Sequence, residues 1–161
     1  MTRRPLGPAD IAALAEASRG DGQPQRICVS LAGVARETIG HRLFTVMRYD
    51  PARNEVERLH SSDPAAYPVG GRKTKRDTAW SDHVLRDGKV FCANDAAGIR
   101  AAFDDHHTIL GLGLASVLNI PVVFNGDVIG TMNLLHEAGW YTKADEATGL
   151  ALAAFLVPVL L

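Results

Sequence analysis

Residues 116–136 read SVLNIPVVFNGDVIGTMNLLH, and this stretch decides the fold. Two apolar arms, 116–124 and 128–136, flank the tripeptide Asn125-Gly126-Asp127. Asn-Gly readily takes the positive φ angles of a tight primed turn, so the stretch predicts a β-hairpin. Both arms are almost continuously apolar, which is typical of central strands covered on both faces.

The segments before and after this hairpin alternate between helical and extended patterns. Ile27, Leu31 and Val34 form one apolar stripe at helical spacing, and Gly40 provides a stop. The loop between the second strand and the short helix is long, and such loops often bind ligands. We expect helices at 10–18 and 24–39, strands at 43–49 and 55–61, a loop at 62–77, a short helix ending at Arg86, a strand at 90–92, a helical then irregular stretch at 96–113, and a last helix opening at a Thr142–Asp145 capping box.

The bulk properties of the chain indicate one globular domain. The 161 residues are 47% hydrophobic and carry a net charge of −1, so no basic field favours nucleic acid. Two cysteines, Cys28 and Cys92, are too few for a disulfide framework. The longest apolar run, 150–161, is interrupted by Pro158, whereas a membrane span needs about 20 residues. No signal-peptide pattern is present. We expect a cytoplasmic protein that neither spans a membrane nor binds nucleic acid.

Three motifs in the second half carry a resemblance to a known family. Residues 116–122 resemble the penultimate strand of GAF domains, with its proline; residues 125–134 resemble their hairpin ending in G-x-(L/M)-N-L; and residues 140–145 resemble the aromatic-Thr entry to their last helix. The resemblance implies an α/β (α+β) fold of the GAF/PAS type: a central antiparallel sheet of five to six strands flanked by helices. We expect an N-terminal helical extension at 1–22 and the GAF-like domain at 23–161.

The resemblance also implies a function. GAF domains usually act as small-molecule-binding regulatory modules in cytoplasmic signalling, with no catalytic output of their own, and a signalling protein is the partner that this implies. One alternative is a thiol-dependent reductase of the free methionine-(R)-sulfoxide type. The segments that carry thiols in those enzymes, here 78–83 and 106–110, contain no cysteine, which leaves Cys92 alone for a mechanism that needs two thiols. A further alternative is a ligand-free dimeric interaction domain.

No cofactor or metal is expected. Of the pattern that bilin-binding members carry, only Ile120-Pro121 is present, and Cys28 precedes the first strand. His83, His106 and His107, with Cys92 as a soft ligand, match no standard zinc spacing.

The candidate ligand-binding residues come from the loop, the short helix and the sheet. Arg72, Lys73, Lys75 and Arg76 follow two glycines and either grip an anion or form a solvated loop. Polar residues in apolar strands either bond to the backbone or face a cavity. The full candidate set is Phe44, Tyr67, Arg72, Trp80, His83, Cys92, His107, Asn119 and Asn133.

The last helix is apolar around most of its circumference. Its apolar residues exceed the single stripe that a sheet can cover, which predicts a homodimer through the terminal helices. They are Leu150, Leu152, Phe155, Leu156, Val159 and Leu160.

Overall fold

The computed structural model describes residues 2–75 and 77–161. Its centre is one antiparallel sheet of six strands in the order β3-β2-β1-β6-β5-β4. The family expectation of a five- to six-stranded antiparallel sheet is confirmed. The strands are β1 (Leu43–Asp50), β2 (Glu55–Ser61), β3 (Arg72–Thr74), β4 (Phe91–Ala93), β5 (Ser116–Phe124) and β6 (Asp127–His136).

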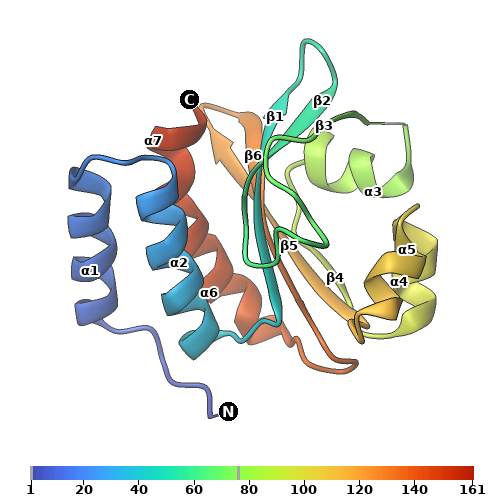
Figure 1. Ribbon diagram of the computed structural model, residues 1–161, viewed down its shortest axis with the longest axis horizontal. Helices are drawn as coiled ribbons and strands as arrows, with labels where there is room; N and C mark the ends of the chain where they lie inside the picture. The colour runs from blue at the N-terminus through green and yellow to red at the C-terminus, as the bar shows by residue number, and fades with distance from the viewer. Residues whose placement is uncertain (1, 76) are drawn as a thin grey trace.

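Helices cover the two faces of the sheet in two separate layers (Figure 1). One layer contains α2 (Gln25–Thr38), α6 (Lys143–Ala153), a 3₁₀ turn at Ala154–Leu156, and α7 (Val157–Leu160). Helix α1 (Pro8–Arg19) packs on the outer side of α2. The other layer contains α3 (Ala79–Ser81), the π-helical turn Asp82–Arg86, α4 (Ala96–Ala102) and α5 (His106–Gly111). Among the described residues, none of the helices combines the length and the apolar character that a membrane span requires.

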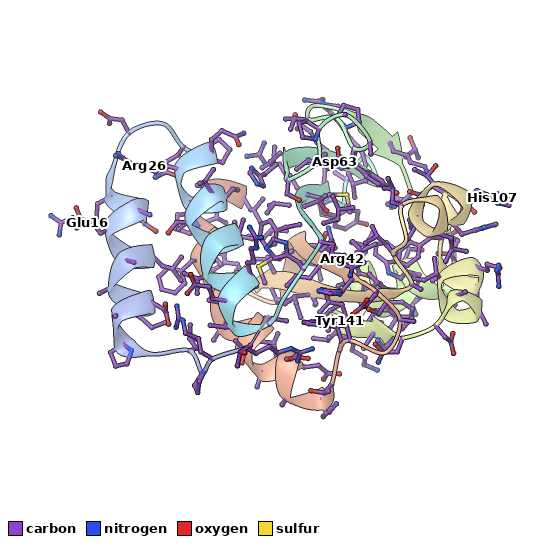
Figure 2. All side chains as sticks on the ribbon, turned by 60° about the horizontal axis from the view of Figure 1, so that its bottom comes forward. Glu16, Arg26, Arg42, Asp63, His107 and Tyr141 are labelled. Atoms are coloured by element: carbon purple, nitrogen blue, oxygen red, sulfur yellow. The ribbon has the colours of Figure 1, made fainter. Side chains whose placement is uncertain are left out.

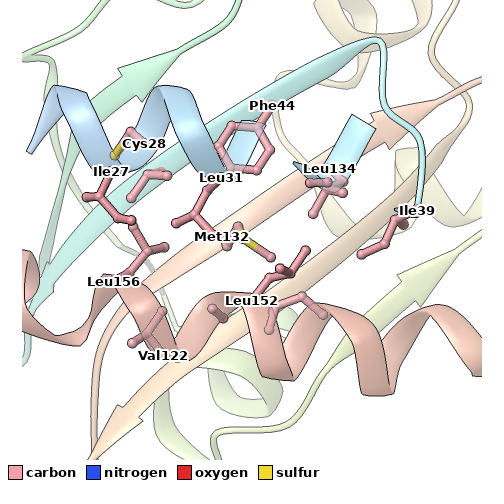
Figure 3. Close-up of a cluster of buried hydrophobic side chains, with 14 of the residues drawn as sticks. Ile27, Cys28, Leu31, Ile39, Phe44, Val122, Met132, Leu134, Leu152 and Leu156 are labelled. Carbon is pink, nitrogen blue, oxygen red and sulfur yellow. The ribbon is translucent and has the colours of Figure 1, made fainter. Parts of the chain in front are cut away.

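The β5–β6 hairpin forms as the sequence predicts. Asn125 and Gly126 take φ angles of 52° and 85°, as a primed turn requires. Side chains alternate across the paired strands, so Leu118, Ile120, Met132 and Leu134 face the first helical layer, and Val117, Asn119, Asn133 and Leu135 face the second. Figure 3 shows the first of these cores, where side chains of α2 and α6 meet the sheet.

Close contacts fix the first helical layer to the sheet. The backbone of Gly149 in α6 lies so near β5 that a Cβ atom there would be 2.7 Å from Cδ1 of Ile120. The start of α6 is held by the predicted capping box, in which the Thr142 backbone N–H donates to Asp145 Oδ2 at 2.8 Å. Arg3 also donates to Asp145 at 2.9 Å, which joins the N-terminal segment to this helix.

The loop predicted for 62–77 is partly wrong. Arg72–Thr74 form the short strand β3, paired with Glu55–Glu57 of β2. The loop composition concealed this strand because its three side chains are exposed and polar, as suits an edge strand that must not attract further strands. Arg76, the last of the expected basic cluster, lies outside the described residues.

Candidate functional site

A cavity of about 260 Å³ lies between the sheet and the second helical layer. Its walls are mostly apolar, and its polar groups gather at the floor and at one side of the rim. The sheet contributes Leu43, Thr45, Met47, Val56, Arg58, Val117, Asn119, Asn133 and Leu135; the loop and β3 contribute Tyr67, Gly71, Arg72, Lys73 and Lys75; the helical layer contributes Trp80, Phe103, Asp105 and Ile109.

The floor of the cavity carries a ladder of hydrogen bonds across three strands. Trp80 Nε1 donates to Asn119 Oδ1 at 3.0 Å, and Asn119 Nδ2 donates to Asn133 Oδ1 at 2.8 Å. Asn133 Nδ2 then donates to Thr45 Oγ1 at 3.1 Å. The register places Asn119 opposite Asn133, and Asn133 opposite Thr45, so the ladder follows directly from strand pairing.

Two cations on the rim are only partly compensated. Burial lowers the pKa of Lys75, whose Nζ lies 4.9 Å from the centre of the Trp80 ring. Burial likewise lowers the pKa of Arg58, whose guanidinium stacks 5.0 Å from the centre of the Tyr67 ring. Within the described part of the chain, Arg58 Nε is buried without a hydrogen-bond partner. Both side chains therefore offer positive charge in a partly dehydrated place.

The rim also carries one carboxylate. The Tyr67 hydroxyl donates a hydrogen bond to Asp105 Oδ2 at 2.9 Å, which connects the 62–71 loop to the residue before α5. Burial and the neighbouring Asp105 carboxylate raise the pKa of Tyr67, so its hydroxyl stays protonated and remains a donor.

Lys75 is held in place by local backbone contacts. Asn54, at the β1–β2 turn with a φ of 51°, donates from Nδ2 to the Lys75 carbonyl at 2.6 Å. The Lys75 backbone N–H donates in return to the Asn54 carbonyl at 2.8 Å. This reciprocal pair anchors the chain just after β3 and keeps the lysine at the cavity.

Five of the nine candidate residues from the sequence line this cavity: Tyr67, Arg72, Trp80, Asn119 and Asn133. Arg72 is also 3.6 Å from Glu57 Oε2, so its charge is partly shared with that neighbour. The side chains of Trp80, Asn119 and Asn133 are buried, and the apolar context of the two asparagines was the signal that they face a cavity.

Phe44 and His83 lie elsewhere. Phe44 sits on the opposite face of β1, fully buried against α2, because neighbouring side chains on a strand alternate in direction (Figure 3). His83 is turned away from the cavity and from Trp80, and its Nε2 lies 2.8 Å from the Val90 carbonyl. The helix widens to π geometry at Asp82–Arg86, so a separation of three residues no longer brings the two side chains into line.

Cys92 and His107 are also outside the cavity. Cys92 packs against the first helical core, and burial together with Glu146 and Asp145 raises the pKa of its thiol. His107 is exposed beside His106 and projects from the outer edge of α5 (Figure 2). In the described ranges, no three His, Cys, Asp or Glu side chains gather as a metal site would require.

Several cavity residues were not singled out from the sequence. Thr45 is two positions from Leu43 and Met47, so strand alternation places it on their face. Arg58 lies in a strand with many polar side chains, and this pattern does not indicate which face of the strand is covered by helices. Phe103 and Asp105 come from the crossover segment, whose path the sequence does not determine.

The chain belongs to the GAF domain family, which matches residues 23–158. No curated protein matches the sequence. Its fold is similar to that of the phycoerythrobilin-bound GAF domain of a cyanobacterial phytochrome, with a TM-score of 0.71, 13% identity, and coverage of 98% of this chain and 96% of that one.

Two further solved structures show the same fold. The GAF domain/HD domain protein from Geobacter sulfurreducens gives a TM-score of 0.70 at 17% identity, with coverage of 88% of this chain and 94% of that one. The chromophore-binding domain of a bacteriophytochrome from R. palustris gives 0.70 at 12% identity, with 94% of this chain covered. The chain spans 60% of that domain.

Proposed function

We propose that this GAF domain is a regulatory module that binds a small anionic molecule in the cavity beneath Trp80 and has no catalytic output of its own. The observation that carries the proposal is the pairing of an apolar cavity with two incompletely compensated cations, Arg58 and Lys75. A ligand carboxylate or phosphate would supply the counter-charge that burial makes valuable there. Tyr67, Arg72, Asn119 and Asn133 complete the proposed set of contacts.

The size of the cavity argues for a ligand built on one ring. At about 260 Å³ it lies just below the roughly 300–1,000 Å³ of typical ligand pockets. The similar phytochrome domain holds phycoerythrobilin, a much larger molecule. We therefore assign a smaller ligand to this chain than to that relative.

The setting of similar domains supports a role in signalling. One structure of this fold comes from a two-component sensor histidine kinase of Bacillus halodurans, and another from a methyl-accepting chemotaxis protein. We assign this chain the same kind of role in the cytoplasm, acting through a signalling protein.

The proposal includes self-association through the terminal helices. Val29 on α2 and Leu150 on α6 are 61% and 49% exposed, which is high for aliphatic side chains on a packed helical layer. Light scattering across a hundredfold range of protein concentration is expected to give the mass of a dimer. A monomer at every concentration would contradict this part of the proposal.

Native and denaturing mass spectra of the purified protein test ligand binding directly. The expected result is an extra mass in the native spectrum that disappears on denaturation. Lys75→Gln should reduce the occupied fraction, whereas Lys143→Gln, which changes an exposed lysine on α6, should leave it unchanged. If the native mass equals that of the polypeptide alone, the ligand-free protein is titrated with ring carboxylates. The absence of binding at millimolar concentration would refute the proposal.

A further inference from the structure

The hydrogen-bond ladder on the cavity floor has a fixed direction, and Trp80 sets it. An indole N–H can donate but cannot accept. The Asn119 atom 3.0 Å from Trp80 Nε1 must therefore be the amide oxygen, and the amide nitrogen must point the other way. The Trp80 N–H thus fixes the orientation of the Asn119 amide group, which could otherwise rotate by 180°.

The same orientation passes along the ladder to Thr45. The Asn119 nitrogen meets Asn133 at 2.8 Å, so the Asn133 atom there is its oxygen. The Asn133 nitrogen then faces Thr45 Oγ1 at 3.1 Å, which makes the hydroxyl oxygen an acceptor. Asn119, Asn133 and Thr45 are only 3%, 3% and 6% exposed, so bulk water does not compete freely for these contacts.

Three hydrogens remain after these contacts are counted. Each amide nitrogen carries two hydrogens, and the ladder uses one of each. The Thr45 hydroxyl accepts, so its own hydrogen is also unused by the ladder. Among the described residues, these three groups donate no further hydrogen bond, and all three side chains line the cavity.

The rim adds further donors to those of the floor. Arg58 and Lys75 are donors only, and Tyr67 donates to Asp105. Asp105, the carboxylate on the cavity lining, already accepts this hydrogen bond and is exposed. Each oxygen of the ladder also keeps one lone pair, so the donors exceed the acceptors in the cavity because of the two rim cations.

We propose that the ligand is a small organic anion whose inner end carries a carbonyl or carboxylate oxygen, and that Trp80 sets the place of this oxygen by orienting Asn119 and Asn133. This inference rests on the proposed function, because it concerns the same cavity. It assigns the anionic group to the Arg58 and Lys75 side and the acceptor oxygen to the amide floor. Trp80 is then a specificity-determining residue through its N–H group as well as a wall of the cavity.

Matched pairs of ring carboxylates test the inference by isothermal titration calorimetry. The probes are the para-acetyl and para-ethyl forms of benzoate, phenylacetate and 3-phenylpropionate, which vary the distance between the anion and the inner end. The acetyl and ethyl groups are similar in size, and the acetyl group alone brings an acceptor oxygen. For the length that fits best, we expect the acetyl compound to bind about tenfold more tightly, which corresponds to about 1.4 kcal/mol.

Trp80→Phe identifies the residue responsible. Phenylalanine keeps an aromatic wall but removes the N–H, so Asn119 can turn its oxygen toward the cavity. The preference for acetyl over ethyl should then fall below about threefold, because a single neutral hydrogen bond contributes little once its partner can reorient. Trp140→Phe is the matched control, since that indole donates to the Ile39 carbonyl and does not line the cavity; it should retain the preference.

A second measurement does not depend on how well the variant folds. In the wild-type protein, the side-chain amide NMR signals of Asn119 and Asn133 should shift with the acetyl compound and much less with the ethyl compound. Equal binding of both compounds, with loss of binding by their methyl esters, would overturn the inference and leave anion binding intact. Failure of all the carboxylates to bind at millimolar concentration would refute the proposed function, and the inference with it.

Discussion

The Tyr67 hydroxyl lies 2.9 Å from Oδ2 of Asp105, and this contact joins two segments across the rim of the cavity. One segment is the loop after β2, which includes the Gly70 N–H bonded to the Arg58 carbonyl at 2.8 Å. The other is the start of α5. The contact therefore holds the loop against the crossover helices beside the cavity.

Removal of this contact should loosen the loop. In Tyr67→Phe, we expect the backbone amide hydrogens of positions 67 and 70 to exchange with solvent about fivefold faster, because an exposed hydrogen bond contributes about 1 kcal/mol. Hydrogen–deuterium exchange with mass spectrometry measures this change. Asp105→Asn keeps an acceptor oxygen and should show a smaller effect. Unchanged exchange in Tyr67→Phe would mean that the loop is held by other contacts.

Stability should fall as the pH drops from 7 toward 5. Burial lowers the pKa values of His41, His60 and His136 below the ordinary 6.5 in the folded state. The unfolded chain then binds more protons than the folded chain below about pH 6.5, so acid favours unfolding in this range. Urea unfolding at several pH values measures the slope. The pKa of Asp10 is about 2 in the folded state and 3.8 in the unfolded chain. The stability that its carboxylate contributes is therefore lost only below about pH 4.

His41→Gln isolates one contribution to that slope. His41 Nε2 lies 2.8 Å from the Ala32 carbonyl, and a glutamine amide can supply a donor without titrating. We expect a shallower decline in the free energy of unfolding between pH 7 and 5. In the control variant His107→Gln, which changes an exposed histidine, the free energy of unfolding should decline with pH as it does in the wild type. Identical slopes for His41→Gln and the wild type would contradict the assignment.

Two glycine substitutions should have opposite effects on stability. A Cβ at Gly130 in β6 would lie 2.3 Å from the Met47 carbonyl oxygen, so Gly130→Ala should lower the free energy of unfolding by about 3 kcal/mol or more. Gly33 in α2 has no neighbour within 4 Å, so Gly33→Ala should raise it by about 0.5–1 kcal/mol. Denaturant unfolding compares the two, and a mild effect at Gly130 would show that β1 and β6 can separate.

The two thiols should react slowly with a disulfide reagent at pH 8. Burial raises the pKa of Cys28 to about 12, and the pKa of Cys92 is raised as well. The thiolate is the reactive form, so both should react at least tenfold more slowly in the folded protein than in guanidinium chloride. Fast reaction of Cys92 would favour the reductase alternative. An assay of methionine-sulfoxide reduction with Cys92→Ser would then follow.

The sequence predicted those parts of the fold that depend on neighbouring residues. The Asn125-Gly126 turn, the Thr142 cap and the two apolar arms are local patterns, and each formed at the expected place. The short strand β3 was missed because its pairing with β2 is a long-range contact between exposed residues.

The candidate site could be predicted only in part, for similar reasons. Asn119 and Asn133 stood out because a buried amide needs a partner. Phe44 lies outside the cavity because neighbouring side chains along β1 point to opposite faces of the sheet. Arg58 lies in β2 and Asp105 in the crossover segment. The two residues reach the same cavity only because of the tertiary path of the chain, which the local sequence does not reveal.

The close approach of Gly149 to Ile120 has a consequence for how an event in the cavity is communicated. Ile120 follows Asn119 in β5, so the residue beneath α6 is one peptide bond from the polar floor. No side chain of Gly149 stands between strand and helix to absorb a displacement, and packed interiors compress little. We therefore expect that a displacement of Asn119 by a ligand reaches α6 through this contact between the two faces of the sheet.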